Sequence, residues 1–282
     1  MYKGIYAILK KEAGFLNTRY GLKATNIIFS SSYDPVPPEN LDISHCHDTY
    51  EILYVVSGEG RCIVEGSIFP IKPGSLMLIS PFQYHKLQVK SDVPYERFVI
   101  NFSDAALLDD VRSFTRGILT EDGTAGRLYS AGAIPSGIIS VFERFELGGS
   151  LSASERSVFM RMLLSEILLL LAVSKGEKLR GDEEELGARV IRYLNENIEK
   201  NISLDKLARR FFVSKYYLCR AFKKHNGISV HGYINQKRVM YAKGLIEQGE
   251  TASGAAYRVG FGDYSAFYRA YVKILGKSPS SD

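Results

Sequence analysis

A stretch of 17 residues occurs twice in the last third of the chain, at 213–229 and again at 262–278. The copies are offset by 49 positions, so that Arg220 aligns with Arg269. Each copy keeps apolar residues four positions apart, which is the spacing of one helix face, and places a basic residue between them. The chain must therefore accommodate a duplicated helix that is apolar on one side and basic on the other. The apolar positions are Leu218, Phe222, Phe267 and Tyr271.

The positive charge of the chain is concentrated around this repeat. The 282 residues carry a formal net charge of +5, and residues 183–282 hold 17 Lys+Arg against 10 Asp+Glu, a net of +7. Residues 1–182 hold 19 against 21, a net of −2. This asymmetry favours a polyanionic partner for the C-terminal third alone, with a solvated basic face as the alternative.

Cysteine content and hydropathy predict a soluble protein of a reducing compartment. Cys46, Cys62 and Cys219 are scattered and fit neither a disulfide framework nor a zinc spacing. Lysines interrupt the N-terminal residues too early for a signal sequence, and the longest apolar run, 167–173, is too short to span a bilayer. We therefore expect a cytoplasmic protein with no membrane partner.

The N-terminal half contains many short β-strand patterns separated by Gly and Pro. Such strands at close spacing indicate a sandwich or small barrel rather than a parallel sheet with crossover helices. Turns are expected at 57–60, 65–67 and 72–74. The apolar or β-branched runs are 51–56, 61–65, 76–79 and 95–101.

A histidine motif lies inside this β-rich region. His45, His47 and Glu51 have the spacing H-x-H-x3-E-x6-G, which resembles the first motif of the cupin family. Residues 73–85 resemble a loosened second motif, in which Gln83 replaces the usual glycine. The resemblance implies a double-stranded β-helix barrel, with His45, His47, Glu51 and His85 turned toward its mouth.

Two chemical interpretations of this motif stay open. Two imidazoles two positions apart lie on one face of a strand, and with a carboxylate and a third His they suit Fe, Mn, Ni or Zn. The alternative is a set of polar side chains that hydrogen-bond a small ligand. Because the second motif is disturbed, we predict ligand contact without a metal or other cofactor, and His45, His47, Glu51 and His85 remain the metal candidates. The predicted effector-binding residues are His45, His47, Glu51, Tyr54, His85, Tyr95 and Arg97.

A long helix is expected in the middle of the chain. Ser152 and Glu155 have the spacing of a capping box, and apolar residues follow at helical spacing over 158–171. The apolar face is wider than one contact requires, so the helix packs on its own barrel or on a second copy, and both interpretations stay open. A shorter helix is expected at 104–114. The charged run 175–185 is predicted to be an interdomain linker.

The C-terminal third predicts two helix-turn-helix units joined by a long helix at about 230–248. Polar residues precede each amphipathic pattern in the position of a helix cap, and Gly227 ends the first repeated helix. A helix of 19 residues is about 28 Å long, close to the roughly 34 Å pitch of B-DNA, so helices at its two ends can enter successive major grooves. The predicted caps are Ser203, Ser214, Thr251 and Asp263.

This region resembles the AraC/XylS family of bacterial transcription regulators. The resemblance rests on two helix-turn-helices in order, which are far more specific than one, and on the cupin-like domain in front, which is the family's usual sensor half. The motifs are I-S-L-x-x-L-A at 202–208, V-S-x-x-Y-L-x-R-x-F-K-K at 213–224, A-x-x-V-G-F-x-D at 256–263 and F-Y-R-A-Y at 267–271.

The resemblance implies DNA contacts on the exposed faces of both repeated helices. Arg can bind guanine O6 and N7 bidentately, Tyr or Ser can contact thymine methyls or the backbone, and Lys attracts phosphate. For Arg220 and Arg269, bracing a neighbouring helix is the alternative role. The predicted DNA-binding residues are Lys215, Tyr216, Cys219, Arg220, Lys223 and Lys224 in the first helix and Tyr264, Ser265, Tyr268, Arg269 and Lys273 in the second.

We therefore predict a multi-domain α+β protein. Residues 1–130 form an all-β cupin-like ligand-sensing barrel with appended helices, residues 131–182 a helical dimerisation segment and linker, and residues 183–282 an all-α DNA-binding domain. Its helix-turn-helix motifs are placed at about 203–225 and 251–275.

The predicted function is that of a transcription regulator rather than an enzyme. It binds double-stranded DNA under the control of a small polar effector such as a sugar, with a homodimer and RNA polymerase as further expected partners. Two other classes stay open. One is a metal-dependent cupin enzyme (an oxygenase or isomerase) with a helical appendage, and the other is a constitutive DNA-binding protein whose barrel only dimerises.

Overall fold

The structure is a computed structural model that describes residues 18–37, 39–90, 92–119, 127–135, 137–174 and 186–281. The chain divides into two compact units, Met1–Asp182 and Glu183–Asp282, which are described in turn. The predicted linker at 175–185 lies outside the described residues. In the part of the chain that is described, no helix has both the length and the apolar character needed to cross a membrane.

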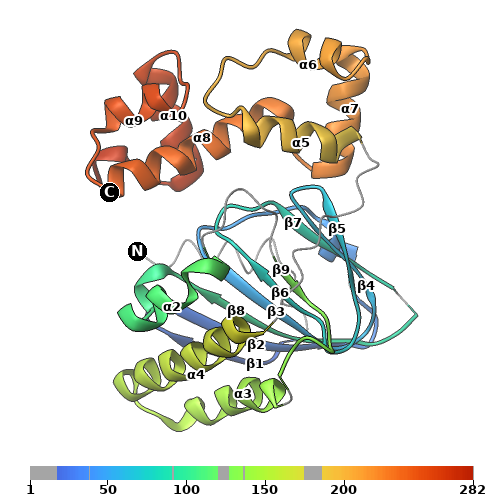
Figure 1. Cartoon of the computed structure of the whole chain (residues 1–282), viewed down its shortest axis with the longest axis vertical. Helices are drawn as coiled ribbons and strands as arrows, with labels where there is room; N and C mark the ends of the chain where they lie inside the picture. The colour runs from blue at the N-terminus through green and yellow to red at the C-terminus, as the bar shows by residue number, and fades with distance from the viewer. Residues whose placement is uncertain are drawn as a thin grey trace. The chain divides into compact units, whose positions relative to one another are not determined.

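The first unit contains two antiparallel sheets (Figure 1). The larger has the strand order β1-β2-β8-β3-β6-β9 and the smaller the order β5-β4-β7. The predicted all-β architecture of this unit is confirmed. The strands are β1 (Thr18–Ala24), β2 (Ile27–Asp34), β3 (Tyr50–Ser57), β4 (Gly60–Val64), β5 (Ser67–Ile71), β6 (Leu76–Ile79), β7 (His85–Val89), β8 (Tyr95–Phe102) and β9 (Arg127–Tyr129).

Both faces of the larger sheet are buried. On β3, Ile52 packs in a core cluster that includes residues of the appended helices, whereas Leu53 packs in a second cluster with the smaller sheet. A strand covered on both faces is apolar at nearly every position, which explains the unbroken apolar runs in the sequence. The helices along one side of this sheet (Figure 1) are η2 (Asp104–Ala106), α2 (Asp109–Leu119), α3 (Ile138–Arg144), η3 (Phe145–Ser150) and α4 (Ala153–Val173). The short helix η1 (Glu39–Asp42) packs instead on β7 of the smaller sheet, where Asp42 pairs with Lys86.

Local sequence rules account for several boundaries in this unit. The capping box of α4 is confirmed, because Ser152 accepts from the backbone of Glu155 and the Glu155 side chain accepts from the backbone of Ser152. The predicted turn between β4 and β5 is also confirmed: Glu65 and Gly66 have φ of 50° and 82°, as a two-residue primed turn requires. The shorter predicted helix is displaced, since α2 begins at Asp109 after a 3-10 turn.

The described residues of the second unit form helices joined by short loops and contain no strand. Every predicted cap is confirmed: Ser203, Ser214, Thr251 and Asp263 each accept a hydrogen bond from the third backbone N–H of the following helix. Gly227 ends its helix in the left-handed conformation, with φ of 72°. The helices are α5 (Leu186–Glu196), α6 (Leu204–Arg210), α7 (Lys215–Asn226), α8 (Val230–Glu247), α9 (Ala252–Arg258), α10 (Tyr264–Leu275) and η4 (Pro279–Ser281).

Helix α8 runs between two groups of helices, α5–α7 on one side and α9–α10 on the other (Figure 1). Its N-terminal part packs on the first group, where the Tyr233 and Phe222 ring centroids are 5.8 Å apart. Its C-terminal part contributes Val239 and Ala242 to the core of the second group. The predicted arrangement of two helix-turn-helix motifs joined by a long helix is therefore confirmed.

Candidate DNA interface and barrel site

Helix α7 buries its apolar face and exposes its basic one. Leu218 and Phe222 are fully buried, as predicted for the core positions of the first repeat. Arg220 is exposed between them, Tyr216 is 76% exposed, and Cys219 is only half-buried. The remaining predicted contacts on α7 are three exposed lysines. One of them forms an ion pair within the protein, because Lys215 Nζ lies 2.9 Å from Asp205 Oδ1 on α6. The exposed lysines are Lys215, Lys223 and Lys224.

Helix α10 has the same division with different chemistry. Phe267 and Tyr271 are fully buried, and the rings of Tyr264 and Tyr268 lie 6.4 Å apart on the outer face. Tyr264 and Tyr268 stand at the positions of Lys215 and Cys219 in the first repeat, and α10 has one exposed lysine where α7 has three, so the two helices offer different contacts to a duplex. The predicted α10 residues, all exposed, are Tyr264, Ser265, Tyr268, Arg269 and Lys273.

Two exposed aromatic residues at the first helix-turn-helix were not among the predicted contacts. Tyr217 is 56% exposed, and Phe212 in the turn before α7 is 94% exposed with φ of 55°. The pattern Y-Y at 216–217 places only one tyrosine on a given helix face, which is why the second was not selected. Phe212 precedes the helix, so helical spacing could not assign its exposure.

Three histidines gather around one carboxylate in the first unit. His47 Nε2 lies 3.1 Å from Glu51 Oε2, and His85 Nε2 lies 3.8 Å from Glu51 Oε1. The backbones of His45 and His85 pair as an isolated β-bridge, which brings their rings to a centroid distance of 4.4 Å. The structure therefore brings together the four residues of the histidine motif.

Backbone carbonyls orient all three imidazoles in the same way. The Nδ1 atoms of His45, His47 and His85 lie 3.0, 2.9 and 2.8 Å from carbonyl oxygens two residues away. These contacts place a proton on Nδ1, since a carbonyl can only accept. Nε2 of His47 faces the Glu51 carboxylate, which also only accepts, so this nitrogen donates as well. His85 Nε2 is buried and accepts no hydrogen bond from any described residue.

The charge state of the cluster follows from burial and from Glu51. Burial would raise the pKa of Glu51, but the hydrogen bond with His47 and the neighbouring imidazoles hold it below its usual value. Burial lowers the pKa of His47, yet Glu51 outweighs this and raises it overall. Burial and the adjacent His45 lower the pKa of His85 to about 3, so this imidazole is neutral.

Asn101 completes the site and was not predicted from the sequence. It lies directly opposite Glu51 in the β3–β8 register, and its Nδ2 donates to Glu51 Oε2 at 3.0 Å. Asn101 shares a strand face with Arg97, so alternation along β8 was the pattern that could have selected it. The pairing with β3 is long-range and could not be derived from local spacing.

The other predicted effector residues occupy different surroundings. Tyr54 lies on the opposite face of β3 from Glu51, in the core cluster shared with the appended helices, and stacks with Phe142. It therefore does not share the space between the sheets. Tyr95 belongs to the cluster between the sheets, and Arg97 lies over its ring at 4.7 Å while pairing with Asp34.

The donor set at Glu51 fits a divalent transition metal. The ligand atoms of His47, Glu51 and His85 all lie within 4.8 Å of one another, with two imidazole Nε2 atoms and one carboxylate facing inward. The Nδ1 contacts to carbonyls and the Asn101 bond are the second-shell contacts that such ligands usually have. His45 is not part of this set.

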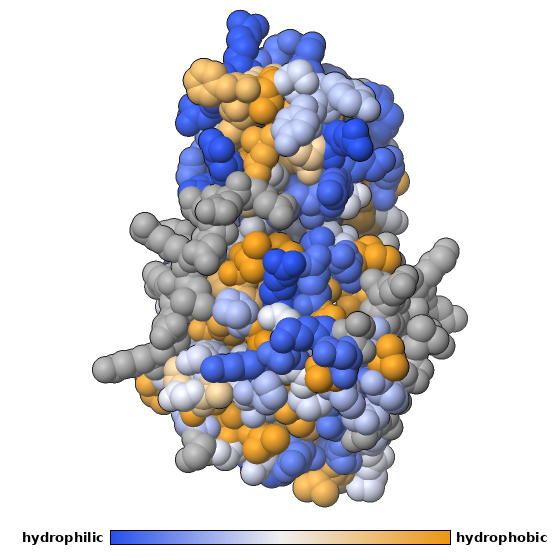
Figure 2. Space-filling view, turned by 90° about the vertical axis from the view of Figure 1, so that its right-hand side faces the viewer, coloured by the Kyte–Doolittle hydropathy of each residue, from blue (hydrophilic) through white to orange (hydrophobic). Residues whose placement is uncertain are grey.

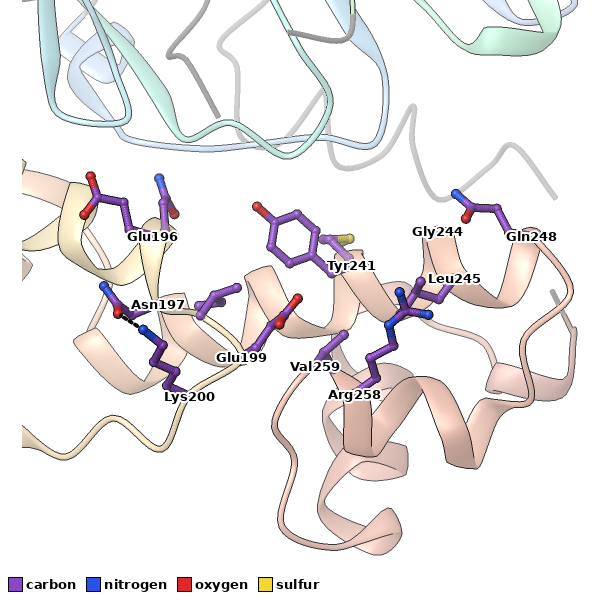
Figure 3. A pocket seen from close by; sticks show the side chains of 13 residues that line it. Glu196, Asn197, Glu199, Lys200, Tyr241, Gly244, Leu245, Gln248, Arg258 and Val259 are labelled. Carbon is purple, nitrogen blue, oxygen red and sulfur yellow. Dashed lines mark hydrogen bonds between the residues drawn. The ribbon is translucent and has the colours of Figure 1, made fainter. Parts of the chain in front are cut away.

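A hollow of about 600 Å³ lies in the second unit, and none of the predicted DNA contacts lines it (Figure 3). It is bounded by the end of α5 and the segment after it, by α8, and by the end of α9. Tyr241 and Arg258 line it, and Lys200 Nζ donates to Asn197 Oδ1 at its edge. On the face of the second unit seen in Figure 2, hydrophilic side chains predominate around a hydrophobic strip.

Two family models match the chain. One, described as an AraC-like ligand binding domain, matches residues 40–171, and the other, described as a helix-turn-helix domain, matches residues 207–281. The first covers the histidine cluster, and the second covers both repeated helices.

Curated relatives and solved structures are similar along most of their length. The HTH-type transcriptional activator RhaS of Mannheimia succiniciproducens is 25% identical over 249 residues, covering 87% of this chain and 91% of RhaS. The HTH-type transcriptional regulator YbfI of Bacillus subtilis is 25% identical over 240 residues, covering 79% and 80%. The structure of ToxT from Vibrio cholerae is 17% identical with a TM-score of 0.36, covering 91% and 97%.

Proposed function

The chain belongs to the AraC family of transcription regulators, with a ligand-binding domain and a helix-turn-helix DNA-binding domain, and we propose that a small polar effector in its barrel controls binding to a two-part DNA site. The observation that carries the proposal is the shared design of α7 and α10. Each buries two large apolar residues and exposes an arginine at the same place in the repeat. This is the arrangement of a helix that docks by one face and contacts DNA by the other.

The two helices have different roles in this proposal. Arg220 and Arg269 contact guanine, and Lys223 and Lys224 supply phosphate contacts that do not depend on sequence. Tyr268 and its neighbours on α10 contact thymine methyls or the sugar-phosphate backbone. One chain then occupies two successive major grooves, and a homodimer occupies a repeat of that site and acts on RNA polymerase.

Footprinting on the region upstream of the gene, against random DNA at physiological salt, tests the DNA-binding proposal. A protected segment spanning two major grooves on one face of the duplex is expected. Replacing Arg220 by Ala should relax specificity at one base position, whereas replacing Lys224 by Ala should weaken all sequences alike. Equal affinity for the upstream region and for random DNA would refute the proposal.

The effector is proposed to be a sugar or a related polar metabolite. Strands β2 and β8 turn buried polar side chains into the space between the sheets, including Ser32, Asp34, Arg97 and Asn101. The buried Ser32 hydroxyl has no hydrogen-bond partner among the described residues. Hydroxyl-rich ligands suit such a lining because each hydroxyl both donates and accepts.

Thermal unfolding in the presence of a panel of sugars tests the effector proposal. A ligand that binds only the native state raises the midpoint temperature of unfolding. At a hundredfold excess over its Kd it adds about 2.7 kcal/mol to the free energy of unfolding. Asn101→Ala should abolish the shift for the active sugar, and Arg61→Ala, an exposed strand substitution, is the matched control. A panel with no stabilising member would contradict the proposal.

A second candidate for the barrel ligand is a divalent transition metal, favoured by the three inward-facing ligand atoms of His47, Glu51 and His85. The metal would supply open coordination positions for oxygen atoms of an effector, or for a substrate if the barrel were catalytic. Elemental analysis after dialysis against Zn²⁺ or Ni²⁺ separates the candidates. The metal hypothesis is supported if the unaltered protein and His45→Ala bind stoichiometric metal and Glu51→Gln does not. It is excluded if the unaltered protein binds no metal.

A further inference from the structure

One side chain on α8 joins three parts of the DNA-binding unit. The Arg238 guanidinium donates from Nε to Ile198 O at 2.9 Å, from Nη2 to Lys200 O at 2.7 Å and from Nη1 to Gly260 O at 2.6 Å. A guanidinium is planar and has five N–H donors in fixed directions, so three simultaneous contacts define the relative positions of the carbonyls that accept them.

The acceptors come from opposite halves of the unit. Ile198 and Lys200 lie in the segment between α5 and α6, in the half that carries α7. Gly260 lies in the turn between α9 and α10, in the half that carries the second recognition helix. Since Arg238 itself lies near the middle of α8, its contacts link both halves and the helix that connects them. Charge-assisted hydrogen bonds of this kind are about twice as strong as neutral ones.

The two halves also touch directly at this point. A Cβ built on Gly260 would lie 2.5 Å from Glu199 O and 2.9 Å from Arg238 Nη2, both too close for any side chain. The backbone of the second turn therefore approaches the segment after α5 as closely as glycine permits.

The equivalent turn of the first helix-turn-helix makes no such approach. Val213 N donates to Ala208 O and Phe261 N donates to Ala256 O, both at 3.0 Å, which aligns Phe212 with Gly260. Both residues have positive φ, of 55° and 91°, but Phe212 is 94% exposed. A large residue can adopt the φ of Phe212, whereas the φ of Gly260 strains any side chain, so the glycine in the second copy is required both by its backbone conformation and by the close contact.

We propose that Arg238 is a positioning residue that fixes the separation and angle between the two recognition helices, and thereby restricts the spacing between the two DNA sub-sites. This inference rests on the proposed two-part DNA site. A tilt of roughly 10° over a helix of about 27 Å displaces its end by about 5 Å, which exceeds one base-pair step of about 3.4 Å. A loosened joint would therefore accept DNA that the intact protein rejects.

The test measures binding to DNA in which the spacing of the two sub-sites changes by one or two base pairs, beside DNA with one sub-site only. The unaltered protein should lose about tenfold in affinity for each wrong spacing, comparable to a mismatched base pair. Arg238→Met keeps the aliphatic stem and removes all three bonds, and it should reduce this loss to about threefold or less while single-site affinity stays within about twofold. Arg258→Met on α9 removes the same charge from an exposed side chain and is the matched control.

Two further measurements keep the outcome decisive. Arg238→Lys retains the charge but replaces the planar fork by a single ammonium nitrogen, which cannot reach all three carbonyls. Gly260→Ala displaces the turn from the other side, so both variants should broaden the spacing profile, and either replaces Arg238→Met if that variant does not fold. An unchanged spacing profile in folded variants would overturn the role of Arg238. Failure of the proposed function looks different, because the unaltered protein would then show no preference among any of these DNAs.

Discussion

The buried ion pair between Asp34 and Arg97 is expected to hold β2 and β8 together at the barrel wall. Arg97 Nη1 lies 2.6 Å from Asp34 Oδ2, and the side chains are 8% and 2% exposed. Arg97→Met keeps the packing over Tyr95 but leaves the Asp34 carboxylate buried without this cation. We expect this change to be among the most destabilising single substitutions in the barrel.

The magnitude follows from the separation and the burial. At an effective dielectric constant of about 20, two charges 2.6 Å apart attract by about 6 kcal/mol, much of which offsets desolvation. Breaking such a pair by removing one partner costs about 3–5 kcal/mol, because the remaining charge stays buried. For a unit of this size the midpoint of thermal unfolding should fall by roughly 10 °C. Asp34→Asn combined with Arg97→Met removes both charges and should recover a large part of that loss.

Thermal and urea unfolding of the four proteins in this double-mutant cycle provide the measurement. A loss below about 1 kcal/mol in Arg97→Met, or strictly additive single substitutions, would refute the reasoning. The same proteins also address the expected effector role of Arg97. If the variant were as stable as the unaltered protein but no longer stabilised by the effector, Arg97 would be a ligand contact instead of a structural partner.

Four further predictions concern single surface positions. Arg220→Ala should cost about 1–3 kcal/mol at one base position in a binding-site selection, and a uniform loss across all positions would contradict base contact. Lys224→Ala should instead reduce the slope of log affinity against log salt concentration by about one. Met162→Glu, on the exposed apolar side of α4 that also carries Val158, should shift a dimer toward monomer in sedimentation analysis, and an unchanged oligomeric state would remove α4 from the interface. Phe212→Gly should raise stability by about 0.5–1 kcal/mol, because it relieves a positive φ at an exposed side chain, and a loss of stability would show that the aromatic ring packs in solution.

The sequence determined most of the helical unit because its decisive interactions are local. A cap such as Ser214 or Asp263 bonds to a backbone N–H three residues away, so its role follows from the neighbouring residues. The buried faces of α7 and α10 follow equally from spacing within one helix. Arg238 could not be selected in this way, because its acceptors lie 22 to 40 residues away.

The barrel was less accessible to sequence analysis for the same reason. Its class followed from many short strands, but the site depends on which strands become neighbours. Asn101 reaches Glu51 only because β8 pairs with β3, and Tyr54 leaves the site because alternation places it on the far face of the same strand. Both faces of β3 are apolar, so hydrophobic patterning alone could not assign the direction of Tyr54.

The repeat hides a difference between the two helix-turn-helices that bears on how they bind. Ser214 and Asp263 cap their helices at an offset of 49, whereas the turn bonds of Val213 and Phe261 are related by an offset of 48, so the second turn is one residue longer. The extra residue, Gly262, lets the second turn dock through Gly260 while α10 buries the same two positions of the repeat as α7. The recognition helices are therefore repeated, but their attachments are not. Because α7 exposes three lysines and α10 one, the expected DNA site is asymmetric: the first sub-site contributes more salt-dependent affinity, and the second contributes contacts that a rigid joint must place correctly.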